Sequence, residues 1–240
     1  MTIQATGLHF RVLNERIRQN EDETVEVVDC IGQRYIAAGL ADRRLEIYGT
    51  PGNALGAYLD GSTIFVHGDA QDAVGDTMND GEIWIDGMAG DALGYAMRGG
   101  KIFVHGNVGY RAGIHMKAYE EKQPLLVIGG EAGSFLGEYQ AGGTIVVLGL
   151  HTKAAVPVGH FCGMGMHGGT IYLRAKELPP DLSDRLLYRP AEATDLEEIR
   201  PALERFCRLF GEDVNEVLDH PFLVVRPDSS NPYQQLYTPN

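Results

Sequence analysis

The chain has 240 residues, 44% of them hydrophobic, which is enough for a substantial buried core. Its formal net charge of -13 argues against nucleic acid and anionic membranes as partners, because both are bound by clusters of Lys and Arg. The start of the chain has no signal-peptide pattern, and no apolar run is long enough to span a membrane. Cys30, Cys162 and Cys207 show no metal-binding, redox or disulfide spacing, so we expect a cytoplasmic protein.

Residues 1–44 lack the pattern that follows and are expected to form an N-terminal segment. Val12–Asn20 has helical spacing, and Thr24–Cys30 alternates apolar and polar residues as a strand does. We therefore expect a short helix and a strand before the main domain.

Residues 45–177 carry a glycine repeat. A glycine closes an apolar run every nineteen residues, and a second glycine follows seven residues later. Glycine is needed where φ is positive or where neighbouring backbone leaves no room for a Cβ. The glycines predicted to form structural turns are Gly49, Gly56, Gly68, Gly75, Gly87, Gly94, Gly106, Gly113 and Gly137.

The apolar runs predict seven short strands, such as Ile64–Val66 and Ile83–Ile85. A nineteen-residue period is too short for a βαβ unit, which needs about 30 residues, or for a propeller blade of about 40. We therefore expect an all-β core, namely a single-stranded right-handed parallel β-helix of about seven turns. Insertions at 117–123 and 151–158 are expected in turns.

Alternation along each strand places the middle residue of each run on the outer face. Such a column of apolar residues either rests against a flanking segment of this chain or forms a partner surface. The residues predicted to contact a partner are Phe65, Trp84, Phe103, Leu126 and Tyr172.

Three groups of polar residues raise the question of a catalytic or metal site. The first, His67, Asp86 and His105, is interpreted as a hydrogen-bond ladder rather than a metal or acid–base site. The second is a column of Asn and Asp side chains of the kind that could form a calcium site or a polysaccharide-cleaving cleft. We interpret these side chains as caps of tight turns. The third lies in a glycine-rich turn and lacks a fourth metal ligand. The second group is Asn53, Asp72 and Asp91, and the third is His160, Cys162 and His167. We therefore assign no catalytic, cofactor-binding or metal-binding residue.

Residues 178–240 also lack the glycine period and are expected to form a helical cap with an extended tail. Thr194 and Glu197 have capping-box spacing, and an amphipathic stripe ends at Gly211. Pro201 is expected to delay or kink this helix. A short helix over 213–219, a strand over 222–225 and an extended tail over 227–240 complete the expected elements.

The tandem units GNALGAYLDG, GDAVGDTMNDG and GDALGYAMRGG resemble the C-terminal GXGXG domain of the glutamate synthase large subunit, in its stand-alone form. LNERI at Leu13–Ile17 and GQRYIAAGL at Gly32–Leu40 fit the start of this domain, and NPYQQLY at Asn231–Tyr237 fits its tail. The C subunit of formylmethanofuran dehydrogenase shares the repeats.

The resemblance implies a non-catalytic assembly subunit of a glutamate-synthase-like oxidoreductase in glutamate biosynthesis. FMN and iron–sulfur clusters are then expected on partner subunits and none on this chain. The partners would be an FMN synthase subunit and a glutamine amidotransferase subunit, with a homo-oligomer as a further possibility. The alternatives are a component of a formylmethanofuran-dehydrogenase-type redox complex, or an enzyme acting on a polysaccharide or acyl group.

Overall fold

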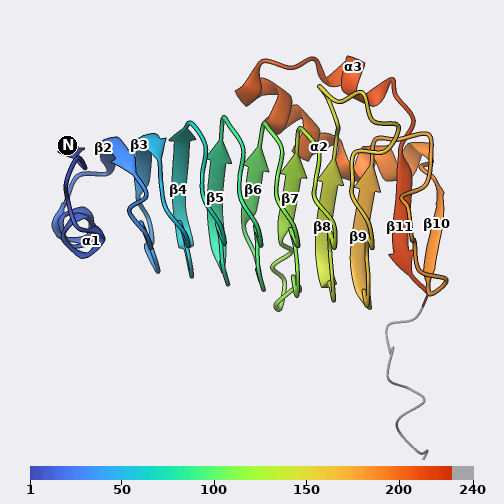
Figure 1. Cartoon of the computed structure of the whole chain (residues 1–240), viewed down its shortest axis with the longest axis horizontal. Coiled ribbons are helices and arrows are strands. Elements are labelled where there is room, and N and C mark those ends of the chain that lie inside the picture. The colour runs from blue at the N-terminus through green and yellow to red at the C-terminus, as the bar shows by residue number, and fades with distance from the viewer. Residues whose placement is uncertain (229–240) are drawn as a thin grey trace, which may run out of the picture.

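The computed structural model describes residues 1–228, which form one long sheet with three helices (Figure 1). The strand order is β1-β2-β3-β4-β5-β6-β7-β8-β9-β11-β10. The strands are β1 Thr2–Gln4, β2 Thr24–Ile31, β3 Arg44–Thr50, β4 Asp60–His67, β5 Asp80–Ile85, β6 Lys101–Val104, β7 Leu125–Ile128, β8 Ala141–Val147, β9 Gly168–Leu173, β10 Leu186–Pro190 and β11 Leu223–Pro227. The helices are α1 Phe10–Gln19, α2 Ala193–Phe210 and α3 Val214–Leu218.

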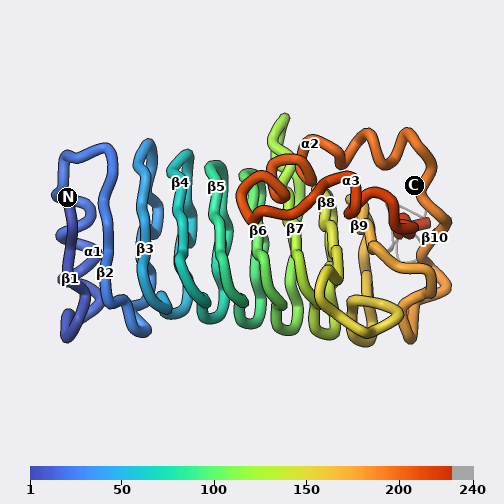
Figure 2. The backbone as a smooth tube through the Cα atoms, turned by 90° about the horizontal axis from the view of Figure 1, so that it is seen from above, coloured from blue at the N-terminus to red at the C-terminus, as the bar shows by residue number. Residues whose placement is uncertain are grey.

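The predicted β-helix of about seven turns with a helical C-terminal cap is wrong. The structure is an eleven-stranded, mostly parallel sheet, in which β1 to β9 pair in parallel and β11 pairs antiparallel with both β9 and β10. Helix α2 lies along one face of this sheet instead of over its end (Figures 1 and 2). The strand predicted over 222–225 is confirmed as β11, but the glycine period could not reveal that β1, β10 and β11 join the sheet, because all three lie outside it.

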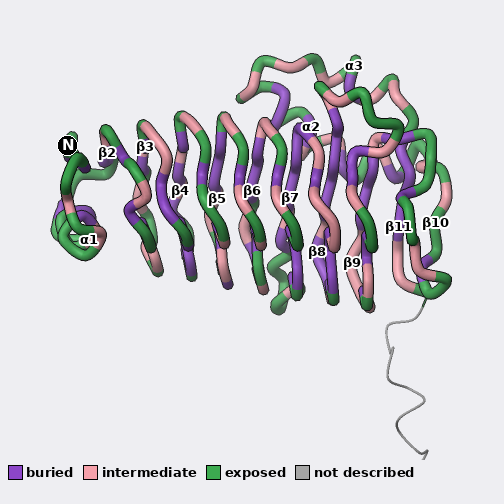
Figure 3. The backbone as a smooth tube through the Cα atoms, in the orientation of Figure 1, coloured by how far each residue is buried: buried purple, intermediate pink, exposed green. Residues whose placement is uncertain are grey.

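Each strand of the repeat region pairs in parallel with the equivalent strand of the next repeat. Ile64 of β4 is opposite Ile83 of β5, which is opposite Ile102 of β6. The segments that connect successive strands also bond to one another, for example through the isolated bridges Ala70–Ala89 and Ala89–Val108. Buried segments therefore recur from strand to strand along the molecule (Figure 3). The core lies between the strands and these connecting segments.

The repeating glycines serve two different purposes. The second glycine of each repeat has a positive φ, as in Gly75 at +69° and Gly94 at +65°. The first glycine permits close backbone approach: a Cβ on Gly106 would lie 2.7 Å from the carbonyl oxygen of Gly87. The sequence predicted turns at both positions, and the structure supplies a separate physical reason for each.

The terminal elements agree with most of the sequence expectations. The predicted first helix and strand are confirmed as α1 and β2, and the second short helix as α3. The predicted capping box at Thr194 is wrong, because Glu192 and Asp195 form it two residues earlier. Helix α2 contains Pro201 and ends at Gly211, whose φ is +75°. The predicted tail from residue 229 onwards, including NPYQQLY, lies outside the described residues.

One sheet runs through all three predicted segments, and their division at residues 44 and 177 stays a prediction. Among residues 1–228, none of the helices has the length and apolar character needed to cross a membrane.

The N-terminus of α2 is held by a buried carboxylate. Asp195, 4% exposed, accepts hydrogen bonds from Arg189 Nη2 at 2.9 Å and from the backbone nitrogen of Glu192 at 2.8 Å. The hydrogen bond from Arg189 lowers the pKa of Asp195 below its ordinary value of 3.8, although burial opposes this shift. The ionised form of Asp195 therefore stabilises the fold.

We expect Asp195→Asn to lower the free energy of unfolding by about 1–3 kcal/mol at pH 7, the usual range for a lost hydrogen bond to a charged group. A carboxyl group with a depressed pKa stabilises the fold above its unfolded pKa and loses that effect as the pH falls through the folded value. The difference between variant and wild type should therefore shrink below about pH 4. Urea unfolding at a series of pH values measures it, and a constant difference down to pH 3 would contradict this assignment.

Candidate partner-binding surface

The outer apolar column is covered by helix α2 over most of its length. Trp84, Phe103 and Tyr172 are 2%, 0% and 0% exposed, and they pack with Leu203 and Phe206 of α2. The indole of Trp84 stacks on the ring of Phe103, with 4.1 Å between ring centroids. Figure 2 shows α2 and α3 lying over the part of the sheet from β6 to β9. Of the two alternatives for the column, coverage by a segment of this chain and contact with a partner, the first therefore applies to these three residues.

Leu126 does not belong to the column. Phe103 is opposite Val127 and Ile102 is opposite Leu126, so the predicted alignment of this repeat was wrong by one residue. Val127 packs beneath α2, whereas Leu126 packs in the core between strands and connecting segments. The apolar run Leu125–Ile128 is uniformly hydrophobic, and alternation therefore could not define its register.

Phe65 marks the border of the covered region. It is partly buried, stacks toward Trp84 at 6.1 Å and lies under the guanidinium of Arg44 at 4.3 Å. The next residue in the column is Glu46, which binds Arg44. The outer face therefore changes from apolar to charged at the edge of the region that α2 covers.

A second set of aromatic side chains lies on the connecting turns. The residues two positions before and after the second glycine have positive φ, among them Arg111 at 59°, Phe135 at 64° and Tyr139 at 53°. We define the turn-edge patch as Tyr95, Arg111, His115, Phe135, Tyr139 and Phe161, all of them exposed or partly exposed.

The patch consists of two rows of neighbouring side chains, in which His115 meets Tyr95 edge to face and stacks on Tyr139. In one row, His115 lies between Tyr95 and Tyr139, with ring centroids 5.9 and 5.2 Å apart. In the other, Phe135 lies between Phe161 at 5.1 Å and the guanidinium of Arg111 at 4.6 Å. Exposed aromatic residues beside an Arg are the composition found at the centres of protein–protein interfaces.

The size of its side chains, rather than its backbone, distinguishes this patch. Positive φ recurs at the same turn positions in other repeats, including Thr77 and Ala92, so the conformation belongs to the repeat as a whole. Several of these equivalent positions hold small residues, such as Ala54, Ala73 and Gly165, although Tyr58 is an exposed aromatic residue outside the patch. Sequence reasoning missed the patch, although large residues at these offsets from Gly113, Gly137 and Gly163 were a usable signal.

The His67 column forms hydrogen bonds along one edge. His67 contacts Glu46 at 2.8 Å and Asp86 at 3.2 Å, which agrees with the predicted ladder. His105 does not continue this ladder, because its Nε2 contacts Glu212 Oε1 at 2.9 Å. Glu212 lies between α2 and α3, far away in sequence.

The acidic column caps turns across repeats. The side chain of Asp72 accepts a hydrogen bond from the backbone nitrogen of Asp91 at 3.0 Å, and that of Asp91 accepts from Tyr110 at 2.8 Å. Glycine must stand beside each acceptor: a Cβ on Gly90 would lie 2.1 Å from Asp72 Oδ1. The capping is therefore between neighbouring repeats, not within one turn as predicted.

The residues of the Gly159–Gly169 turn are not brought together. His160 Nδ1 contacts Asp181 at 2.6 Å, His167 Nδ1 contacts the carbonyl of Gly165 at 3.2 Å, and Cys162 is buried. Burial raises the pKa of Cys162 to about 12. This thiol is therefore protonated at neutral pH and is a weak nucleophile.

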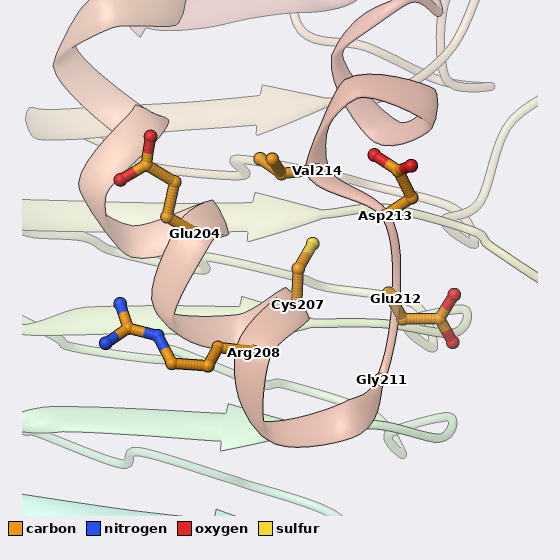
Figure 4. A pocket seen from close by; sticks show the side chains of 7 residues that line it. All are labelled: Glu204, Cys207, Arg208, Gly211, Glu212, Asp213 and Val214. Atoms are coloured by element: carbon orange, nitrogen blue, oxygen red, sulfur yellow. The ribbon is translucent and has the colours of Figure 1, made fainter.

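A shallow depression of about 430 Å³ lies where α2 meets α3 (Figure 4). Cys207 points into it, and burial raises the pKa of this thiol to about 11. The depression is lined by Glu204, Cys207, Arg208, Gly211, Glu212, Asp213 and Val214. Its wide opening favours a surface contact over an enclosed reaction site.

Comparisons with known proteins agree with this fold. A family model described as "GXGXG motif" matches residues 17–226. An uncharacterized protein of Methanocaldococcus jannaschii is 46% identical over 253 residues, covering 100% of this chain and 97% of that protein. A chain in the crystal structure of the formyltransferase/hydrolase complex of Methylorubrum extorquens, with methylofuran bound, has a TM-score of 0.61 and 19% identity. That match covers 82% of this chain and 71% of that chain, and it shows a shared fold.

Proposed function

The chain belongs to the GXGXG motif family, and we propose that it is a non-catalytic assembly subunit of a multi-subunit enzyme complex. The observation that carries this proposal is the turn-edge patch, in which aromatic residues and Arg111 remain exposed. Within the described residues, the polar columns are engaged in hydrogen bonds between repeats. The patch therefore offers partner subunits a broad surface.

The structural neighbour favours a complex that handles formyl groups. That neighbour is a chain of a formyltransferase/hydrolase complex, so the shared fold is used in a multi-subunit assembly. We propose accordingly that this chain acts as a component similar to the C subunit of a formylmethanofuran-dehydrogenase-type redox complex. Catalytic groups would then reside on its partner polypeptides.

A glutamate-synthase-like complex is the second candidate. It is supported by LNERI, which lies in α1, and by GQRYIAAGL, whose Tyr35–Leu40 portion forms a turn equivalent to those of the glycine repeats. In this case the partners would be a glutaminase polypeptide and an FMN synthase with iron–sulfur clusters. Either complex would use the present chain to hold its enzymes together.

Affinity purification from native cells distinguishes the two candidates. Co-purification of a molybdenum or tungsten enzyme with formyl-transfer subunits supports the first, and of an FMN synthase with an amidotransferase the second. Recovery of the chain without any stoichiometric partner, under gentle conditions and at native abundance, would contradict the assembly role.

The turn-edge patch can be tested with Tyr139→Gly, using Tyr58→Gly as the matched control. Both tyrosines are exposed and occupy the same position of the repeat, with φ of 53° and 57°, but only Tyr139 belongs to the patch. Glycine relieves the positive-φ strain in both variants, so we expect unfolding free energies within about 1 kcal/mol of wild type.

We expect Tyr139→Gly alone to weaken binding of the co-purified partner by at least about tenfold, the effect of losing a hot-spot aromatic residue. Surface plasmon resonance with the isolated partner measures this. Equal binding by the two variants would remove the patch from the interface.

A further inference from the structure

We propose that His105, His151 and Glu212 form a metal-binding site for Zn²⁺. The three residues come from separate parts of the chain. His105 directly follows β6, His151 lies in the insertion after β8, and Glu212 lies between α2 and α3. Their candidate ligand atoms all lie within 4.8 Å of one another. Spacing along the chain could not predict this cluster, since the residues are separated by 46 and 61 positions.

The distances suit a single ion. Glu212 Oε1 is 2.9 Å from His105 Nε2 and 3.5 Å from His151 Nε2. Ligands about 2.0–2.2 Å from a tetrahedral Zn²⁺ lie roughly 3.3–3.6 Å from one another, so the His151–Glu212 separation already fits, whereas the His105–Glu212 hydrogen bond would open by about 0.5 Å to admit the ion. His151 is on the surface, with a side chain that is 68% exposed, so it is free to complete the geometry by a small rotation.

The donor set favours zinc over calcium or magnesium. Two imidazoles and one carboxylate are the protein ligands of many zinc sites in which water occupies the fourth position. Calcium and magnesium prefer sites composed of oxygen atoms. Because the side chain of His151 is exposed, water has access to this cluster.

Neighbouring groups orient two of the three ligands. The imidazole of His105 stacks in parallel on the ring of Phe210, with 4.8 Å between centroids and 1° between planes. Glu212 is held just beyond Gly211, which ends α2 with a positive φ. Figure 4 shows the Glu212 carboxylate directed away from Cys207 and Arg208 of the nearby depression. It is therefore available to the two histidines.

A bound ion would tie the corner between α2 and α3 to the sheet. It would join this corner both to the end of β6 and to the insertion at 151–158. Because only the folded chain brings the three ligands together, Zn²⁺ should stabilise the native state by mass action. This role adds to the proposed assembly function and does not depend on it.

The test uses the full-length, tag-free protein with Zn²⁺ as the probe, in excess Mg²⁺ to occupy oxygen-only sites on this acidic chain. We compare wild type with His151→Ala and with the control His160→Ala, in which another exposed histidine beside a carboxylate is removed. Isothermal titration calorimetry gives stoichiometry and affinity. Co²⁺ absorption reports tetrahedral nitrogen and oxygen coordination.

We expect wild type and His160→Ala to bind one Zn²⁺ per chain, with melting temperatures raised by about 5 °C at saturating metal. His151→Ala should bind at least about tenfold more weakly, since even second-shell changes cost 10–100-fold in metal affinity. Equal Zn²⁺ affinity in His151→Ala and wild type, or no stoichiometric binding in wild type, would overturn the proposal.

Discussion

Replacing Gly75 by valine is expected to lower the free energy of unfolding by about 3–5 kcal/mol, because it combines positive-φ strain with overpacking. Gly75 has a φ of +69°, and a Cβ there would lie 2.4 Å from Cδ1 of Ile102 in the next strand but one. A β-branched residue is disfavoured in this conformation more than any straight side chain. Thermal unfolding should show a melting temperature lower by roughly 10–15 °C.

Gly75→Ala is the matched variant for this test. Alanine already occupies the equivalent position of the turn that precedes the first repeat, where Ala37 has a φ of 58° and is buried. We therefore expect Gly75→Ala to cost about 1–2 kcal/mol, less than half the effect of valine. If Gly75→Val melts at the wild-type temperature, this glycine does not have the turn role described above.

Replacing Trp84 by alanine is expected to destabilise the fold by about 3–5 kcal/mol, the range for removing a buried aromatic residue. The sequence analysis placed Trp84 among the residues predicted to contact a partner, for which truncation would weaken partner binding more than folding. The structure reverses that expectation, because Trp84 is 2% exposed and stacks between Phe65 and Phe103 beneath α2. Urea unfolding followed by circular dichroism measures the loss.

Two controls separate packing from surface effects. Trp84→Phe keeps an aromatic ring and removes the Nε1 hydrogen, which is buried and has no hydrogen-bond partner among residues 1–228, so we expect a cost well below that of alanine. Phe65→Ala removes a ring from the same column outside the covered region and should also cost less than Trp84→Ala. A Trp84→Ala protein as stable as wild type would show that α2 does not pack on this column.

The strands of the repeat could be predicted because their signal is local. A short apolar run such as Ile83–Ile85, bounded by turn glycines, specifies a strand whatever surrounds it. Helix α1 and the end of α2 at Gly211 could be predicted for the same reason. In contrast, the run Leu125–Ile128 is apolar at each position, so it contained no information about which side chain faces out.

The candidate sites were harder to predict, because each depends on contacts between distant segments. The sequence of the apolar column is compatible both with exposure to solvent and with burial beneath α2. Only the packing of Leu203 and Phe206 against the column shows that it is buried. The turn-edge patch depends on stacking across repeats, as between Phe135 and Phe161. The histidine–glutamate cluster brings together three segments that no spacing connects.

By itself, the sequence determined the repeat, the strand positions, the need for glycine at the turns and the membership of the family, because these follow from side-chain periodicity and local backbone geometry. Only the tertiary structure decided how the sheet ends, which apolar face is covered and which aromatic residues remain exposed. Those properties depend on where β11, β10 and α2 pack against strands far away in the chain. Packing of this kind depends on complementary surfaces, for which a single sequence carries no periodic signal.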